Sequence, residues 1–149
     1  MNASKILCPT DFSTMGQTAL EMATSLARDR GATLVIMHVE EPPMAYGGGE
    51  LYYGIEEPNR EELKRMLSEV VPADPAVPYE HRLMIGSPAT AIVEMAQREN
   101  VNLIVMPTHG RTGLMRLLMG SVAEEVVRKA KCPVLTVKPA AANVAKAVA

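Results

Sequence analysis

Short runs in which apolar residues predominate constrain the fold of this chain more than any other feature. Three of them are Lys5–Pro9, Thr33–Val39 and Leu103–Met106, and none shows the regular alternation of apolar and polar residues. A strand with one solvated face alternates, whereas a strand covered on both faces is apolar along its length. These runs therefore predict central strands of a sheet that is covered on both sides.

Helical periodicity separates the first two runs. One apolar stripe at helical spacing is formed by Met15, Ala19, Met22, Ala23 and Leu26. Thr14 followed by Gln17 predicts a capping box at the start of this helix, and Gly31 predicts a left-handed cap at its end. The first third of the chain is therefore expected to form a strand, a helix and a strand.

Two further helices and a strand are expected in the middle of the chain. A second stripe, behind a cap at Asn59, consists of Leu63, Met66, Leu67 and Val70. Tyr79–Ile85 is a strand of mixed polarity, which favours an edge position in the sheet. Ser87 and Pro88 are typical of a helix start, and Ala89, Ile92, Val93 and Ala96 provide its buried stripe.

The last elements complete an alternation of strands and helices. Ser121 with Glu124 predicts a capping box for a final helix, and Pro133–Lys138 predicts a fifth strand. Parallel strands joined through helices cross over right-handed, which favours a doubly wound α/β domain with three layers. We expect one domain over residues 1–139, with a long loop at 40–58 rich in Gly and Pro and a loose tail at 140–149.

Charge and cysteine content exclude several classes of protein. The 15 Lys and Arg residues against 17 Asp and Glu argue against a chain that binds nucleic acid by neutralising phosphates. No apolar run approaches the roughly 18 residues that span a bilayer, and Met1–Lys5 lacks a secretory stretch, so we expect a cytoplasmic protein without membrane contact. Cys8 and Cys132 are predicted to be unpaired small hydrophobes in a reducing compartment.

Ligands of doubly wound sheets bind at the carboxyl ends of the strands, where the winding direction reverses. After the predicted strands come Pro9–Ser13, His38–Glu41 and Pro107–Gly113. Gly120 has no side chain to obstruct a phosphate, and the amide groups of Ser121 and Val122 open a helix where an anion is stabilised. These segments therefore predict a phosphate cradle, to which Arg111 adds charge.

Two distant segments resemble the universal stress protein family. Lys5–Ser13 (KILCPTDFS) resembles the opening of the family, and Met106–Val137 resembles its closing half. The nucleotide-binding branch carries G-x2-G-x9-G-[ST] after the fourth strand, which Gly110 and Gly120-Ser121 match, whereas Pro107 stands at the first glycine position. The predicted fold class is thus a Rossmann-like, five-stranded parallel sheet of order 3-2-1-4-5 with helices on both faces.

The resemblance implies a binding site for ATP or another adenine nucleotide, with Mg²⁺ left open as an accompanying ion. It implies contacts from Pro9, Thr10 and Asp11 near the ribose and base, from Val39 and Met106 beside the adenine, and from Gly110, Arg111, Gly120, Ser121 and Val122 around the phosphates. It also implies a homodimer through the last strand, by way of Val134, Leu135, Thr136 and Val137. Some of the nucleotide-contact residues have a simpler interpretation, since Asp11 suits a turn, Gly120-Ser121 suits a turn with a helix cap and Arg111 suits a solvated face.

The function follows as a regulatory, nucleotide-binding stress-response module, and two alternatives stay open. Pro107 offers no amide hydrogen to a ligand, so a dimeric interaction protein without nucleotide is the second interpretation. The third is a slow ATP hydrolase. The sequence contains no P-loop motif and no evident general base or metal-binding carboxylate pair, which argues against fast turnover. We interpret His109 as a loop histidine with a backbone partner and His38 as a satisfied core residue.

Overall fold

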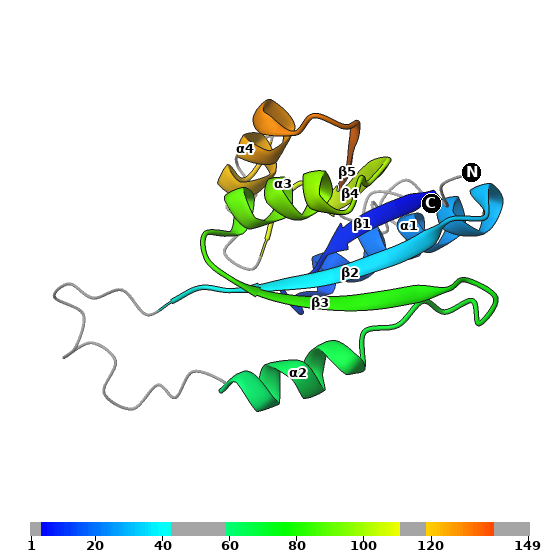
Figure 1. The fold of residues 1–149 in the computed structure, drawn as a ribbon, viewed down its shortest axis with the longest axis horizontal. Coiled ribbons are helices and arrows are strands. Elements are labelled where there is room, and N and C mark those ends of the chain that lie inside the picture. Colours follow the sequence, from blue (N-terminus) through cyan, green and yellow to red (C-terminus); the bar gives the residue numbers. More distant parts are fainter. Residues whose placement is uncertain (1–3, 43–58, 111–118, 139–149) are drawn as a thin grey trace, which may run out of the picture.

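The computed structural model describes residues 4–42, 59–110 and 119–138. Within these ranges strands and helices alternate along the chain (Figure 1). The elements are β1 (Lys5–Pro9), α1 (Thr14–Arg30), β2 (Thr33–Glu40), α2 (Arg60–Ser68), β3 (Tyr79–Ile85), α3 (Pro88–Arg98), β4 (Leu103–Pro107), α4 (Ser121–Lys129) and β5 (Val134–Val137). Residues 43–58 of the expected loop and the expected tail lie outside the described residues. No described helix has the length and apolar character that crossing a membrane requires.

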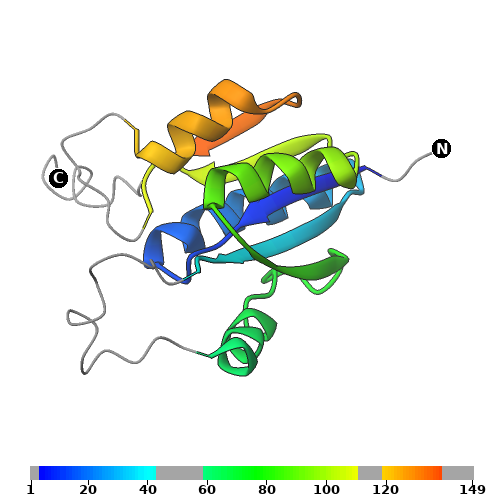
Figure 2. The ribbon, with the colours of Figure 1, turned by 60° about the vertical axis from the view of Figure 1, so that its left-hand side comes forward.

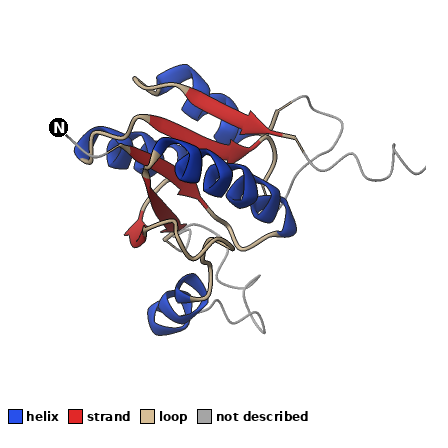
Figure 3. Ribbon diagram, turned by 90° about the vertical axis from the view of Figure 1, so that its right-hand side faces the viewer, coloured by secondary structure: helices blue, strands red, loops and turns tan. Residues whose placement is uncertain are grey.

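The sheet confirms the predicted topology. Its five strands are parallel and follow the order β3-β2-β1-β4-β5, so β3 lies at an edge as its mixed polarity indicated. The central strands are buried where the apolar runs predicted, with Leu7, Val35 and Ile104 at 0% exposure. Figure 3 shows the helices on both sides of the sheet. The winding direction reverses between β1 and β4, which is where this architecture places ligands.

Each face of the sheet has its own core. On one face, α3 and α4 lie beside each other (Figure 2) and pack with Leu7, Met37 and Met106. On the other face, residues of α1 and α2 pack with Ile6 and Cys8. Because side chains of a strand alternate between the two faces, neighbouring residues of β1 belong to different cores. The two faces therefore offer two chemically separate environments at the carboxyl end of β1.

The helix ends confirm some expectations and correct others. Gly31 has φ 64° and caps α1 in the left-handed conformation, and Asn59 Oδ1 accepts a hydrogen bond from the Glu62 amide at 2.8 Å. The predicted capping boxes at Thr14 and Ser121 are wrong, because the caps are Ser13 and Gly120 and neither makes a side-chain cap bond. Backbone geometry places each helix start one residue earlier than the hydroxyl side chains suggested.

The buried stripe of α1 is also rotated from the prediction. Met22 is 42% exposed, although the periodicity placed it in the core. The buried residues of α1 are Gly16, Ala19, Leu20, Ala23, Thr24 and Ala27. Small side chains on this face allow the helix backbone to approach the sheet, so close packing here is decided by size more than by hydrophobicity. The larger methionine is left on the solvent side.

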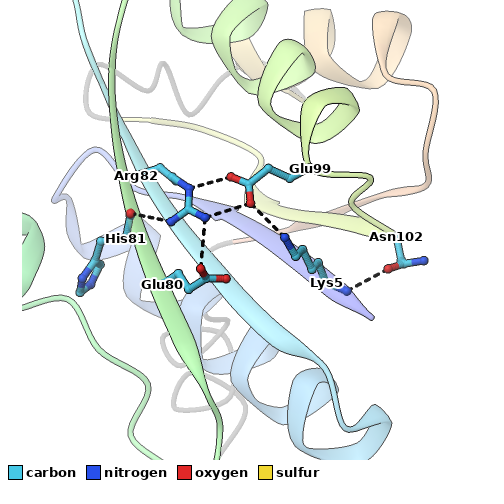
Figure 4. A network of polar contacts seen from close by, with 6 residues as sticks. All are labelled: Lys5, Glu80, His81, Arg82, Glu99 and Asn102. Atoms are coloured by element: carbon cyan, nitrogen blue, oxygen red, sulfur yellow. Dashed lines mark hydrogen bonds and ion pairs between the residues drawn. The ribbon is translucent and has the colours of Figure 1, made fainter. Parts of the chain in front are cut away.

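An ion network ties the C-terminal end of α3 to the sheet (Figure 4). The Glu99 carboxylate accepts hydrogen bonds from Arg82 Nε at 2.7 Å and from Lys5 Nζ at 3.1 Å. Asn102 Oδ1 accepts a bond from the Lys5 amide at 2.8 Å. Burial by itself raises the pKa of Glu99, but the bonds and charges of Arg82 and Lys5 outweigh burial and hold that pKa below its usual value. The network thus stabilises the fold away from the carboxyl ends of β1 and β4.

Candidate functional site

The ladder between β1 and β4 stops short of the carboxyl ends of the two strands. Their ladder pairs Ile6 with Leu103 and Leu7 with Ile104, whereas β1 stays paired with β2 as far as Pro9. The carboxyl ends of β1 and β4 therefore have no shared ladder, and this gap lies at the point where the strand order reverses. The segments after these two strands are the ones that the sequence indicated for ligand contact.

Asp11 and Gly110 lie beside each other at the carboxyl ends of β1 and β4. A Cβ built on Gly110 would lie 3.0 Å from Asp11 Oδ2, so the backbone after β4 passes directly beside the carboxylate. The other carboxylate oxygen, Oδ1, accepts a hydrogen bond from the Ser13 amide at 2.9 Å. Asp11 is thus a turn residue, and its other carboxylate oxygen, Oδ2, lies beside the Gly110 backbone.

The turn that carries Asp11 is held by its own side chains and by β2. Phe12 has φ 66°, a left-handed conformation that is rare for a bulky residue. Its amide donates to Thr10 Oγ1 at 3.0 Å, and the Thr10 amide donates to the Met37 carbonyl at 2.8 Å. Such strain persists only where surrounding contacts determine the conformation, and these bonds fix the direction of Asp11.

His38 anchors the same turn from β2. Its Nδ1 lies 2.8 Å from the Thr10 carbonyl oxygen and donates to it, because a carbonyl only accepts. The ring of Phe12 packs on the His38 ring with 4.3 Å between centroids. The expectation of a satisfied histidine is confirmed, and the structure adds a positioning role that the sequence did not reveal.

Gly120 lies where two backbone segments approach closely. Its amide donates to the Thr108 carbonyl at 2.7 Å, and a Cβ at this position would lie 3.2 Å from that same oxygen. This close approach favours glycine here whether or not a ligand binds. The role of Gly120 toward a phosphate stays a prediction, and the amide groups of Ser121 and Val122, at the exposed start of α4, are the candidate donors.

Thr108 and His109 form a buried polar pair that sequence reasoning did not combine. They are 3% and 6% exposed, and Thr108 Oγ1 lies 3.0 Å from His109 Nδ1. The Thr108 amide also donates to the Val137 carbonyl at 3.0 Å, which joins this segment to β5. A threonine between an apolar strand and a glycine gave no signal of burial, because loops in this position are usually solvated.

The adenine-contact candidates lie on one face of the sheet. Met106 is 4% exposed and Val39 is partly buried, and both belong to the core cluster under α3 and α4. Pro9 is half-buried at the end of β1. Arg111 lies outside the described residues. The structure thus joins Asp11 to Gly110 and Gly120 to Thr108, and it puts the two apolar candidates into one cluster.

Pro107 ends β4. Ile104 and Thr108 donate their amides to the carbonyls of Pro133 and Val137, so alternation along the strand directs the backbone nitrogen of residue 107 to the opposite side, toward β1. The ladder with β1 has already ended at Ile104, so proline at position 107 removes no ladder hydrogen bond. Pro107 therefore offers no amide hydrogen on this side of the strand end.

The described residues contain no group of three or more His, Cys, Asp and Glu side chains that could hold a metal ion. The segments after β1 and β4 and the start of α4 offer backbone amides, the Asp11 carboxylate and apolar side chains. This set can accept hydrogen bonds from hydroxyl groups at Asp11, donate backbone bonds to an anion at the start of α4, and contact a flat apolar group at Val39.

Comparisons with known proteins agree with this architecture. Residues 2–138 match the model of the universal stress protein family. Universal stress protein MJ0531 of Methanocaldococcus jannaschii is 38% identical over 141 residues, which cover 90% of this chain and 81% of that protein.

Solved structures extend the comparison. The structure of the hypothetical protein MJ0577 of the same organism covers 94% of this chain and 99% of its own, with a TM-score of 0.71 and 29% identity. A universal stress protein in complex with cAMP covers 93% of this chain and 98% of its own, with a TM-score of 0.61 and 27% identity. With the parallel sheet and the matching family model, this chain belongs to the universal stress protein family.

Proposed function

We propose that this chain binds an adenine nucleotide at the carboxyl ends of β1 and β4, where the strand order reverses. The observation that carries the proposal is the 3.0 Å approach between Asp11 Oδ2 and the Cβ position of Gly110, which unites the two segments that match the family signature. The relative in complex with cAMP, 27% identical to this chain, supports an adenine-containing ligand.

The proposed contacts follow from the chemistry of each group. Asp11 Oδ2 accepts hydrogen bonds from the ribose hydroxyls, since a carboxylate accepts without donating. Val39 and Met106 contact the adenine ring, with Thr10 and Pro9 beside it. The amides of Ser121 and Val122 donate to phosphate oxygens at the positive end of the α4 dipole, near Gly110 and Arg111. ATP, with Mg²⁺ or without it, is the proposed ligand among adenine nucleotides.

A regulatory binding role fits these residues better than rapid turnover. His109 is 6% exposed with Thr108 Oγ1 at 3.0 Å from its Nδ1, and Asp11 Oδ1 is engaged by the Ser13 amide. Groups held in this way suit positioning of a ligand more than activation of a water molecule. Slow hydrolysis of ATP remains the third interpretation, and phosphate release that rises above a buffer control over several hours would support it.

The binding proposal has a direct test. The chain contains no Trp, so its absorbance at 280 nm is weak, and adenine that is retained on purification gives an excess at 260 nm. Calorimetric titration of the nucleotide-free protein with ATP, cAMP and adenosine then measures affinity and preference. Saturable heat with at least one of them supports the proposal. A clean protein spectrum together with no heat from any of the three contradicts it.

The second candidate function, a dimer that acts through protein contacts without nucleotide, is favoured by the surface of β5. This strand ends the sheet, and Leu135 on β5 and Val127 on α4 are 36% and 45% exposed. We propose that two copies pair through Val134, Leu135, Thr136 and Val137, whether or not nucleotide is bound, because an unpaired apolar edge strand favours association. Light scattering that gives a monomer mass at micromolar concentration contradicts the dimer.

A further inference from the structure

The end of β2 carries two neighbouring residues that serve opposite faces of the sheet. Val39 belongs to the core cluster under α3 and α4, whereas the His38 ring packs on Phe12, which belongs to the cluster on the other face. This is the alternation expected of a strand. β2 therefore presents an apolar side chain on the face of the proposed adenine contact and a hydrogen-bonding ring to the turn after β1.

The His38 ring is bonded to the peptide group that directly precedes Asp11. Its Nδ1 lies 2.8 Å from the Thr10 carbonyl oxygen, and this carbonyl is part of the peptide that joins Thr10 to Asp11. Because a carbonyl oxygen only accepts, Nδ1 carries the hydrogen. The bond restricts rotation of this peptide plane, which sets the direction in which the chain enters Asp11.

The rest of the turn is strained and depends on that peptide plane. Phe12 has φ 66°, which a bulky residue adopts only where surrounding contacts determine it. The Phe12 amide donates to Thr10 Oγ1 at 3.0 Å, and the Ser13 amide donates to Asp11 Oδ1 at 2.9 Å. These bonds lie within the turn itself, whereas the His38 bond ties the turn to the sheet. Loss of the His38 bond would therefore allow the turn to relax.

We propose that His38 is a positioning residue for recognition of the ribose. Through the Thr10 carbonyl it directs the Asp11 side chain, whose Oδ2 lies 3.0 Å from the Cβ position of Gly110. The inference rests on the proposed function, in which Asp11 accepts hydrogen bonds from the ribose hydroxyls. Because His38 and Val39 are neighbours in one strand, the same element fixes the spacing between the contact to the base and the contact to the ribose.

A second histidine provides a matched control for a purely structural role. His81 of β3 is half-buried like His38, and its Nε2 lies 2.7 Å from the Val70 carbonyl oxygen. Removal of either ring leaves a carbonyl without its histidine partner, which lowers stability in both cases. A loss of ligand affinity that merely followed stability would appear at both positions, whereas a positioning role predicts it at position 38 alone.

Asparagine and leucine at position 38 separate the hydrogen bond from the ring. Their side chains branch at the same atom, and asparagine Nδ2 can take the place of histidine Nδ1, so His38→Asn keeps the donor and His38→Leu removes it. Both variants lose the contact with Phe12, so that contact cancels when they are compared. Without nucleotide, we expect the Ser13 amide, which is bonded to Asp11 Oδ1, to exchange with solvent faster in His38→Leu than in His38→Asn. Amide NMR measures the exchange.

Calorimetric titrations with adenosine and adenine measure recognition of the ribose. We expect His38→Leu to lose about tenfold in affinity for adenosine, the equivalent of about 1.4 kcal/mol, and less than about twofold for adenine, which has no ribose. His38→Asn is expected to stay within about threefold of the natural chain for adenosine, and His81→Leu to change neither affinity. On an Asp11→Asn background, His38→Leu should cause no further loss, because residues that act through one another are not additive.

A failure of this inference differs from a failure of the proposed function. Equal losses of adenosine affinity in His38→Asn and His38→Leu, equal losses for adenosine and adenine, or a further loss on the Asp11→Asn background overturn the positioning role and leave nucleotide binding intact. If the natural chain gives no heat with adenosine or with ATP, the proposed function fails and the role of His38 in it fails as well.

Discussion

Asp11 and Gly110 lie against each other at the carboxyl ends of two neighbouring strands, with 3.0 Å between the Asp11 Oδ2 atom and the position of a Cβ at residue 110. A hydrogen bond of 2.9 Å from the Ser13 amide to the second carboxylate oxygen, Oδ1, restricts movement of the carboxylate away from residue 110. Space beside the carboxylate therefore depends on the absence of a side chain at position 110. This relationship gives the nucleotide proposal its sharpest tests.

Gly110→Ala is expected to weaken nucleotide binding while the fold is retained. The added methyl group displaces the Asp11 carboxylate and disturbs a charged hydrogen bond of about 1.5–3 kcal/mol, which corresponds to a loss of at least tenfold in affinity for ATP. Calorimetry measures the affinity. Gly16→Ala is the matched control, because its Cβ meets Thr10 Oγ1 at an ordinary 3.5 Å. Equal affinities for the two variants contradict the assignment.

Asp11→Asn separates the two roles of this side chain. The amide oxygen of asparagine still accepts the Ser13 bond, so the turn and the free energy of unfolding change by less than about 0.5 kcal/mol. The loss of charge weakens binding of adenosine, which retains the ribose, by about tenfold. Urea unfolding and calorimetry measure the two quantities. A stability loss without any change in adenosine affinity would show that Asp11 serves only the turn.

Pro107→Gly is expected to increase affinity for nucleotide. It restores an amide hydrogen on the side of β4 that faces β1, and a neutral hydrogen bond from this amide to the ligand contributes about 0.5–1.5 kcal/mol, or up to about tenfold in affinity. Pro107→Ala restores the same amide without the flexibility of glycine, so both variants should bind ATP more tightly than the natural chain. Were only the glycine variant to gain, chain flexibility and not the amide would be responsible.

Gly120→Ala is expected to destabilise the protein whether or not a ligand is present. Its Cβ would lie 3.2 Å from the Thr108 carbonyl oxygen, and the backbone must shift to admit it. We expect a loss of about 1–3 kcal/mol in the free energy of unfolding without nucleotide, as for other overpacked sites. Urea unfolding measures it. Unchanged stability combined with lost binding would restore the earlier interpretation, in which position 120 leaves room for phosphate.

Glu99→Gln tests the ion network and its dependence on pH. The pKa of Glu99 is lower in the folded chain than in the unfolded chain, so the network stabilises the fold above the unfolded pKa of about 4.3 and loses that contribution as pH falls through the lower folded value. At pH 7 the variant should lose about 1–3 kcal/mol relative to the natural chain, and the difference should shrink in acid.

Glu80→Gln is the control for the network. Glu80 has a side chain that is 44% exposed and makes one bond to Arg82 Nη2 at 3.2 Å, so its replacement should change stability by less than about 1 kcal/mol. Urea unfolding of both variants between pH 7 and pH 3 measures the effect. A deficit for Glu99→Gln that stays constant across this range would mean that the charge of Glu99 contributes nothing.

The order of elements could be predicted because the signals are local. A predominantly apolar run such as Thr33–Val39 indicates a strand that is covered on both faces. Ser87 and Pro88 indicate the start of α3. Finer local detail was less reliable. The rotation of α1 was wrong at Met22, because its packing face is chosen by small side chains that allow close approach to the sheet.

The sequence by itself therefore determined the alternation of strands and helices and the burial of the central strands, since each depends on residues close together in the chain. Only the tertiary structure decided that Asp11 lies beside Gly110 and that the Gly120 amide is bonded to the Thr108 carbonyl. These relationships join residues far apart in sequence, and the distance between two such groups depends on how strands diverge and helices pack, which no local pattern encodes.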